Sequence, residues 1–290
     1  RDRKIESLRD IISLGKGDYV DDAMYELGRT YVQTERFNDG AAVLKRLTET
    51  YPESPYYLPA LSQLGLTYQN LGNGNEALRY YKQIVAEFPS SRQAKDEMLS
   101  IRNIYVDNND VDSYVAFARE SGVETNVTMV ERDSLSYTAA NRVYQNGDYA
   151  RALTLMDNYL RQYPKGSFRI EALYALGDCS LREGNRAGAL AAFEEVGSMP
   201  MSEYKVPALQ QAAKMQVEDK HYPQAAALYK TLSTVAIKSA DIASALGGYL
   251  SAVIATGNVA EMGRAADEVL ASPYVTADLT REANFAKARA

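Results

Sequence analysis

The sequence predicts an all-α fold, an α-α superhelix of about seven helix-turn-helix units with partial units at both ends. Three observations predict it: an internal repeat, apolar residues at helical spacing within each repeat, and turn-forming residues between the two helical segments. Leu27-Gly28 recurs as Leu64-Gly65, and Tyr31 recurs as Tyr68 and again as Tyr105. Gly28 and Gly65 stand 37 positions apart, as do the tyrosines. A fixed period of this length is typical of a solenoid.

The second unit shows the elements of one repeat in order. A first apolar stripe runs from Leu61 to Leu71, and the turn Gly72–Asn75 ends that helix. A second stripe runs from Ala77 to Val85 before Pro89 ends it. Gly65 and Ala77 are small, so we expect the two helices to approach closely there. Because one hairpin cannot bury its own apolar face, neighbouring hairpins must stack.

The same register divides the whole chain. First-helix centres fall near Gly28, Gly65, Arg102, Ala140, Gly177, Ala213 and Leu250. Residues 122–130 are rich in β-branched side chains without helical periodicity, which predicts a longer connecting loop or, alternatively, a hinge between two subdomains. We therefore expect the last helix of a preceding repeat at 1–17, units one to three at 18–122, an irregular connector at 123–132, units four to seven at 133–275 and a truncated following helix at 276–290. Both partial ends indicate a longer natural solenoid.

Composition restricts the function. The 290 residues are 46% hydrophobic, and 32 Lys and Arg against 38 Asp and Glu give a net charge of −6. This balance lacks the basic excess that phosphate binding requires, so nucleic acid is not an expected partner. No apolar run reaches the roughly 18 residues of a membrane span. With one Cys and one His, an intrachain disulfide and a Cys/His zinc site are both excluded. We expect no cofactor and no metal.

The residues that could carry catalysis have simpler explanations. His221 falls in the predicted turn of unit six, and as the single His it leaves a Ser-His-Asp or Cys-His mechanism no other candidate. Cys179 lies on a helical stripe and is expected to be a small buried thiol. The glycine-rich turn Gly72–Asn75 follows no strand, so it is punctuation rather than a phosphate loop. Adjacent acids such as Glu194 and Glu195 point about 100° apart on a helix, which favours a solvated face. We therefore expect that residues 1–290 do not form an enzyme.

The spacing Leu61-x2-Leu64-Gly65-x2-Tyr68, then Ala77-x3-Tyr81 and Pro89, resembles the tetratricopeptide pattern, with Leu in the position of its Trp. The resemblance extends over nearly the whole chain and implies a right-handed superhelix. It also implies a concave binding face, lined by first-helix positions off the packing stripe. In this register those positions are Tyr25, Arg29, Gln33, Ser62, Gln69, Asn103, Tyr137, Asn141, Tyr174, Asp178, Gln210 and Lys214. Such side chains suit an extended peptide, because amides bond its backbone while tyrosine rings cover apolar groups.

The phrases Tyr51-Pro-Glu-Ser-Pro-Tyr56 and Phe88-Pro-Ser-Ser91 resemble bacterial envelope members of the family, such as the Tol-Pal coordinating protein and the lipoprotein of outer-membrane β-barrel assembly. That resemblance implies a non-enzymatic, periplasmic or outer-membrane-associated scaffold that binds a partner protein or peptide. Two alternatives stay open. One is a cytoplasmic adaptor or regulator with the same solenoid, and the other is the interaction domain of a larger enzyme whose catalytic part lies elsewhere.

Overall fold

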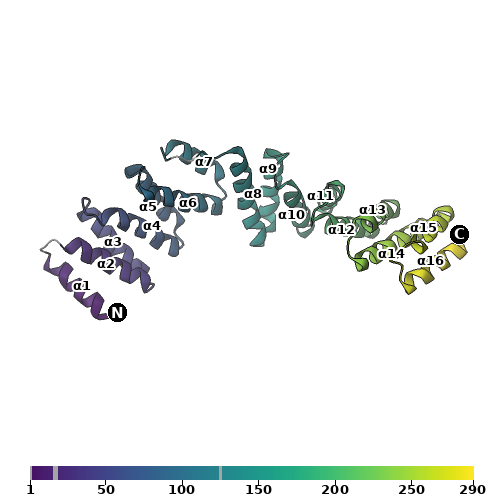
Figure 1. Cartoon of the computed structure of the whole chain (residues 1–290), viewed down its shortest axis with the longest axis horizontal. Coiled ribbons are helices and arrows are strands. Elements are labelled where there is room, and N and C mark those ends of the chain that lie inside the picture. Colours follow the sequence, from purple (N-terminus) through teal and green to yellow (C-terminus); the bar gives the residue numbers. More distant parts are fainter. Residues whose placement is uncertain (1, 16–18, 124–125) are drawn as a thin grey trace. The chain divides into compact units, whose positions relative to one another are not determined.

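The computed structural model describes residues 2–15, 19–123 and 126–290, and these residues form sixteen α-helices and no strand (Figure 1). The helices are α1 (Asp2–Leu14), α2 (Val20–Gln33), α3 (Phe37–Thr50), α4 (Tyr57–Asn70), α5 (Gly74–Glu87), α6 (Arg92–Asp107), α7 (Val111–Glu120), α8 (Met129–Gln145), α9 (Tyr149–Gln162), α10 (Arg169–Arg182), α11 (Arg186–Ser198), α12 (Lys205–Glu218), α13 (Tyr222–Val235), α14 (Ser239–Thr256), α15 (Val259–Leu270) and α16 (Ala277–Arg289). The predicted all-α fold of helix-turn-helix units is confirmed: seven hairpins run from α2/α3 to α14/α15 in the described part of the chain.

The chain divides into two compact units, Arg1–Ala139 and Ala140–Ala290. In the first unit each helix from α1 to α7 packs against the next one along the chain. Its core includes the fully buried Leu44, Leu64, Ile84 and Ile101, one from each of four successive helices. In the second unit α9 to α16 pack in the same sequential manner. The interior helices of each series therefore have a neighbour on both sides, as expected when one hairpin cannot bury its own stripe.

The turn inside each hairpin places one residue in the left-handed backbone region. These residues are Glu35, Gly72, Asn109, Gly147, Gly184, Lys220 and Gly257, with φ between 56° and 81°. The N–H after this residue then closes the helix end: in unit two, the Asn73 N–H donates to the Tyr68 carbonyl at 2.8 Å. The equivalent bond closes the first helix in the first six hairpins, although Glu35, Asn109 and Lys220 occupy the left-handed position without being glycine. In the seventh hairpin the Asn258 N–H donates instead to Oγ1 of Thr256 at 3.2 Å.

Glycine in the first helix lets the second helix approach closely, as predicted for Gly65. A Cβ on Gly65 would lie 2.3 Å from Cε1 of Tyr81. The equivalent Gly28 and Gly177 face Leu44 and Phe193, at 2.5 Å and 2.8 Å from where a Cβ would stand. Each of these large side chains is almost fully buried. The glycines thus make room for the side chain that fills the hairpin.

The irregular connector is shorter than the predicted 123–132, because helix α8 begins at Met129. A reciprocal cap explains this start. The Glu131 N–H donates to Oγ1 of Thr128 at 3.1 Å, and the Thr128 N–H donates to Oε2 of Glu131 at 2.8 Å. This capping box is a strong helix-start signal that outweighs the β-branched residues around it. Residues 124–125 of the predicted connector, and the predicted boundary at 17–18, lie outside the described residues.

The two ends are single helices that pack on complete hairpins. Helix α1 rests on α2 through the buried Ile5 and through an ion pair of 2.8 Å between Lys4 and Glu26. Helix α16 packs on α14 and α15, with Leu279 and Ala283 buried. Each end helix covers an apolar face that would otherwise be exposed.

Candidate functional site

The predicted binding residues of the first unit start on α2. Tyr25 is half-buried and stacks on Tyr56, with ring centroids 5.1 Å apart. Arg29 donates to Glu26 at 3.0 Å, and its guanidinium lies 5.7 Å from the Tyr25 ring. Glu26 also receives a hydrogen bond from Lys4, and this bond is the main reason that its pKa is lowered. Tyr25 and Arg29 are therefore held in place by contacts within the fold.

A groove of about 520 Å³ crosses the first helices of this unit. It is lined by Tyr25 from α2, by Pro59, Ser62, Gln63, Leu66 and Gln69 from α4, by Tyr81 from α5, and by Gln93, Asp96, Glu97 and Ser100 from α6. We call this the α2–α4–α6 groove. Of the predicted residues it brings together Tyr25, Ser62 and Gln69. Arg29, Gln33 and Asn103 lie on the same helices but do not line it, and Gln33 and Asn103 are exposed.

Glu97 is the most unusual residue of the groove. Only 8% of it is exposed, and its carboxylate accepts a hydrogen bond from the Ser62 hydroxyl. No lysine or arginine of the described residues forms an ion pair with it. Burial raises the pKa of Glu97, although the Ser62 and Ser100 hydroxyls oppose that effect by stabilising the charge. A carboxylate without a cation is thus held in a site where its charge is costly.

Tyr81 joins the groove to the hairpin core. Its ring is packed against Gly65, and its hydroxyl donates to Oε1 of Gln69 at 3.1 Å. Burial raises the pKa of Tyr81, and the nearby charge of Glu97 adds to this effect. Tyr81 is only 2% exposed, so packing surrounds nearly all of the side chain. The position of Gln69 is therefore tied to the packing of the hairpin.

The remaining predicted residues lie on α8, α10 and α12. Tyr137, on α8 in the first unit, and Asn141, on α8 in the second, are both half-buried. Tyr174 packs between Phe193 and Tyr204, with ring centroids 5.6 Å and 5.1 Å away. Tyr174 therefore packs against the hydrophobic core of the second unit.

Asp178 is held within the second unit. It accepts hydrogen bonds of 2.9 Å from the Tyr144 hydroxyl and from Nε of Arg182. Burial is the main reason that the pKa of Tyr144 is raised, and the bond to Asp178 raises it further. Two of the acceptor sites of this carboxylate are thus already used, which leaves it a smaller capacity for a partner.

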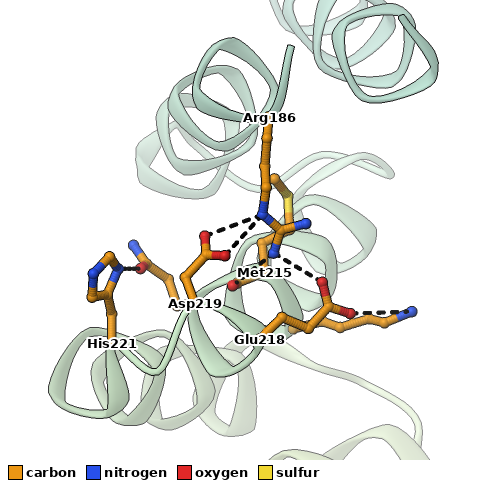
Figure 2. A network of polar contacts seen from close by, with 7 residues as sticks. Arg186, Met215, Glu218, Asp219 and His221 are labelled. Atoms are coloured by element: carbon orange, nitrogen blue, oxygen red, sulfur yellow. Dashed lines mark hydrogen bonds and ion pairs between the residues drawn. The ribbon is translucent and has the colours of Figure 1, made fainter. Parts of the chain in front are cut away.

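Polar contacts at the end of α12 involve Lys214 and His221, two residues that the sequence analysis considered (Figure 2). Arg186, from the start of α11, donates to Asp219, to Glu218 and to the Met215 carbonyl at 2.8 to 3.0 Å. Lys214 lies 3.9 Å from the same Glu218. Gln210, a turn earlier, is exposed. The network caps the carbonyl end of α12 and ties it to the preceding hairpin.

His221 and Cys179 have the positions that the sequence predicts. His221 is exposed at the start of α13, with Nδ1 3.0 Å from Oε1 of Gln216, so it belongs to the turn. Cys179 is fully buried, and burial raises the pKa of its thiol to about 11. A protonated thiol of this kind is a poor nucleophile. In the described part of the chain no three metal-binding side chains cluster, and none of the helices is long and apolar enough to span a bilayer.

Glu97 is absent from the predicted set, although the repeat alignment contains a signal for it. The equivalent position is a buried alanine in five units, namely Ala23, Ala60, Ala172, Ala208 and Ala245. A carboxylate in a position that otherwise holds a buried methyl group is a local exception to the fold. Comparing the repeats position by position, rather than following the binding positions alone, would have found it.

The repeated hairpins make this a helical-repeat protein, and such a fold suggests a protein-interaction scaffold. Sequence profiles of the tetratricopeptide repeat match residues 22–54, 59–91 and 137–198. These segments coincide with the hairpins α2/α3, α4/α5, and with α8 to α11. The chain therefore carries tetratricopeptide repeats in these segments, and the all-α repeat fold continues beyond them. Proteins with these repeats are generally non-catalytic scaffolds that bind proteins or peptides.

Two curated relatives are similar over part of the chain. The outer membrane protein assembly factor BamD of Xylella fastidiosa, from strains 9a5c and Temecula1, is 24% identical over 191 residues. The match covers 59% of this chain and 56% of the relative's length. The chain thus spans little more than half the length of these relatives.

Solved structures also match at low identity. A tetratricopeptide repeat protein from Parabacteroides merdae is 14% identical with a TM-score of 0.33, over 92% of this chain and 98% of that one. The C-terminal part of a repeat protein from Cytophaga hutchinsonii is 13% identical with a TM-score of 0.40, over 89% and 98%. The TPR2AB domain of yeast Sti1, in its complex with pHSP90, is 14% identical with a TM-score of 0.36, over 86% and 90%.

Proposed function

We propose that this protein is a non-enzymatic scaffold of the bacterial envelope that binds a partner protein or an extended peptide on the face formed by its first helices. The observation that carries the proposal is the α2–α4–α6 groove. It is lined by side chains from three successive first helices, and it combines amide and hydroxyl groups with a stacked tyrosine. This combination suits a peptide, since polar groups can bond the backbone while aromatic rings cover side chains.

The size of the groove fits the proposal. Its volume of about 520 Å³ lies within the range of ordinary ligand pockets. Tyr25 and Gln69 stand at different parts of the lining and are held in place by Tyr56 and Tyr81 respectively. Groups that are already ordered lose little conformational entropy when a partner binds.

The envelope assignment is supported by the sequence phrases at residues 51–56 and 88–91 and by the weak similarity to BamD. We propose a periplasmic or outer-membrane-associated position, in which the second unit presents Asn141, Tyr174, Asp178, Gln210 and Lys214 as an additional contact surface.

Affinity capture tests the proposal. The whole chain is used as bait in an envelope fraction of its source organism, and bound proteins are quantified by mass spectrometry. A Tyr25→Ala/Gln69→Ala variant removes two groove groups, and it should weaken capture of specific partners by about 2 kcal/mol, or roughly thirtyfold. The control is Lys45→Ala/Glu49→Ala, which removes an exposed ion pair from the second helix α3.

Each result bears on a different part of the proposal. Envelope proteins that are lost with the groove variant but kept with the control support it. Partners that the two variants retain equally would contradict binding at the first-helix face. Capture of partners only from a cytoplasmic fraction would contradict the envelope assignment and favour a cytoplasmic adaptor.

A further inference from the structure

The buried carboxylate of Glu97 forms part of the wall of an open groove, and within the described residues it is bonded by hydroxyl groups but paired with no lysine or arginine. We propose that the α2–α4–α6 groove binds a peptide segment through one lysine or arginine side chain, whose cation pairs with Glu97. This inference rests on the proposed function, because it names the chemistry that the first-helix face would recognise.

The charge of the lining is the first argument. Asp96 and Glu97 line the groove, whereas no lysine or arginine is among its lining residues. Asp96 pairs with Arg92 at 3.7 Å, and both of these side chains are largely exposed. Such an exposed pair does little to neutralise a carboxylate that lies below it. A cation that enters the groove would therefore meet an uncompensated negative charge.

The geometry of Glu97 is the second argument. An ionised carboxylate has about four acceptor sites. The Ser62 hydroxyl uses one of them, and the Ser100 hydroxyl also stabilises the charge. The remaining sites can accept the N–H groups of an ammonium or a guanidinium. Because Glu97 is already dehydrated in the fold, much of the desolvation cost of that ion pair has been met before the peptide arrives.

The walls of the groove suit the stem of such a side chain. Leu66 is a large apolar residue with 46% of its surface exposed, and Tyr25 presents a ring that is fixed against Tyr56. Lysine and arginine carry apolar stems that pack on surfaces of this kind while the charged end reaches a polar group. Gln63 and Gln93 also line the groove, where their amides can bond the peptide backbone.

The repeat alignment is the third argument. The position of Glu97 holds a buried alanine in five of the other units, so packing alone does not require a carboxylate there. The side chain instead introduces a charge whose burial opposes folding. Pairing with a cationic ligand would explain why a carboxylate stands at this position, whereas packing of the fold does not.

A random library of 12-residue peptides, displayed on their own messenger RNA, tests the proposal. The library is selected at 150 mM salt against the wild-type chain, Glu97→Gln and Glu120→Gln. Glu97→Gln keeps the shape and the hydrogen bond from Ser62. Glu120→Gln makes the same change in net charge at an exposed site on α7. We expect at least tenfold enrichment of lysine or arginine at one peptide position with the wild type and with Glu120→Gln, and its loss with Glu97→Gln.

A selected peptide then gives the coupling directly. Its affinity is measured by fluorescence anisotropy, alongside a version in which the enriched lysine is acetylated or the arginine is replaced by citrulline. Each single change, in the peptide or at Glu97, should weaken binding at least tenfold. Both changes together should weaken it by much less than the product of the two, because each removes the same ion pair. Circular dichroism checks that Glu97→Gln remains folded.

Three results would overturn the inference: enriched peptides without a basic residue, equal enrichment by Glu97→Gln, or no enrichment at all. In the first two cases peptides still bind, and the proposed function stands with a different recognition chemistry. In the third case the capture experiment with the Tyr25→Ala/Gln69→Ala variant decides separately whether the first-helix face binds proteins.

Discussion

Replacing Gly65 by alanine tests how the hairpin core and the groove are joined. The added Cβ would stand 2.3 Å from Cε1 of Tyr81, whereas carbon atoms pack best at about 3.5 to 4.0 Å. The Tyr81 ring would therefore have to retreat by more than about 1 Å. The ring is almost fully buried, and its hydroxyl is bonded to Gln69, so little free space is available for this movement.

The size of the effect follows from two opposing contributions. Overpacking of this kind costs about 1 to 3 kcal/mol, and the tight contact favours the upper part of the range. Alanine is better than glycine in a helix interior by about 1 kcal/mol, which offsets part of this cost. We therefore expect Gly65→Ala to lower the free energy of unfolding by about 2 kcal/mol. For a unit of about 150 residues this corresponds to a decrease in Tm of about 4 to 8 °C.

Urea and thermal unfolding, followed by far-ultraviolet circular dichroism, measure this change. Gly74→Ala is the matched control, because the atom nearest to its added Cβ lies at 3.6 Å, an ordinary contact, so the variant should be neutral or slightly stabilising. Adding Tyr81→Leu to Gly65→Ala should cost less than the two separate changes combined, since the smaller side chain makes room. Equal stability of Gly65→Ala and the wild type would refute the reasoning.

Three further predictions follow from single residues. Burial raises the pKa of Glu97, so the folded state holds the Glu97 proton more tightly than the unfolded state does. Protonated Glu97 therefore contributes to stability at acidic pH, and that contribution is lost as pH rises through the folded pKa. Unfolding measured against pH should show Glu97→Gln more stable than the wild type at pH 7 and the difference shrinking towards pH 4; a constant difference would contradict the burial of the charge. Lys220 has a φ of 62° where four of the other six turns use glycine, so Lys220→Gly should stabilise the fold by about 0.5 kcal/mol in urea unfolding. Gly184→Ala should destabilise it by about 1 kcal/mol, and the reverse order would contradict the turn geometry. The thiol of Cys179 has a pKa of about 11 against an ordinary value of 9.0, so at pH 8 it should react with iodoacetamide at least a hundredfold more slowly than after unfolding, and rapid labelling of the native chain would show that the thiol is accessible.

Much of the fold could be predicted from sequence because its period is carried by local signals. Glycine at positions 28, 65 and 177, and the turn after each first helix, repeat at nearly constant spacing. A hairpin is built from contacts that lie close in sequence, so such patterns specify it well. The observed start of α8 at Met129 lies inside the predicted connector. The cap formed by Thr128 and Glu131 is a short signal within a segment whose composition favours a loop.

The candidate site could be predicted less fully. Register identifies the helix face of a residue, and Tyr25, Ser62 and Gln69 accordingly line one groove. Register does not show which neighbours satisfy a side chain. Asp178 is bonded by Tyr144 and Arg182, which stand 34 positions before it and four after it. The hydrogen bond from Ser62 on α4 to Glu97 on α6 likewise joins two repeats, so no single repeat contains it.

Site-specific photocrosslinking tests the central claim most directly, that partners bind on the first-helix face. Benzoylphenylalanine is placed at Gln69 on α4 and at Gln210 on α12, and at two exposed second-helix positions, Ala86 on α5 and Ala227 on α13. Irradiation in an envelope fraction should give discrete cross-linked proteins from the two first-helix positions and little from the two second-helix positions. Cross-links that arise equally from all four positions, or mainly from Ala86 and Ala227, would contradict the account.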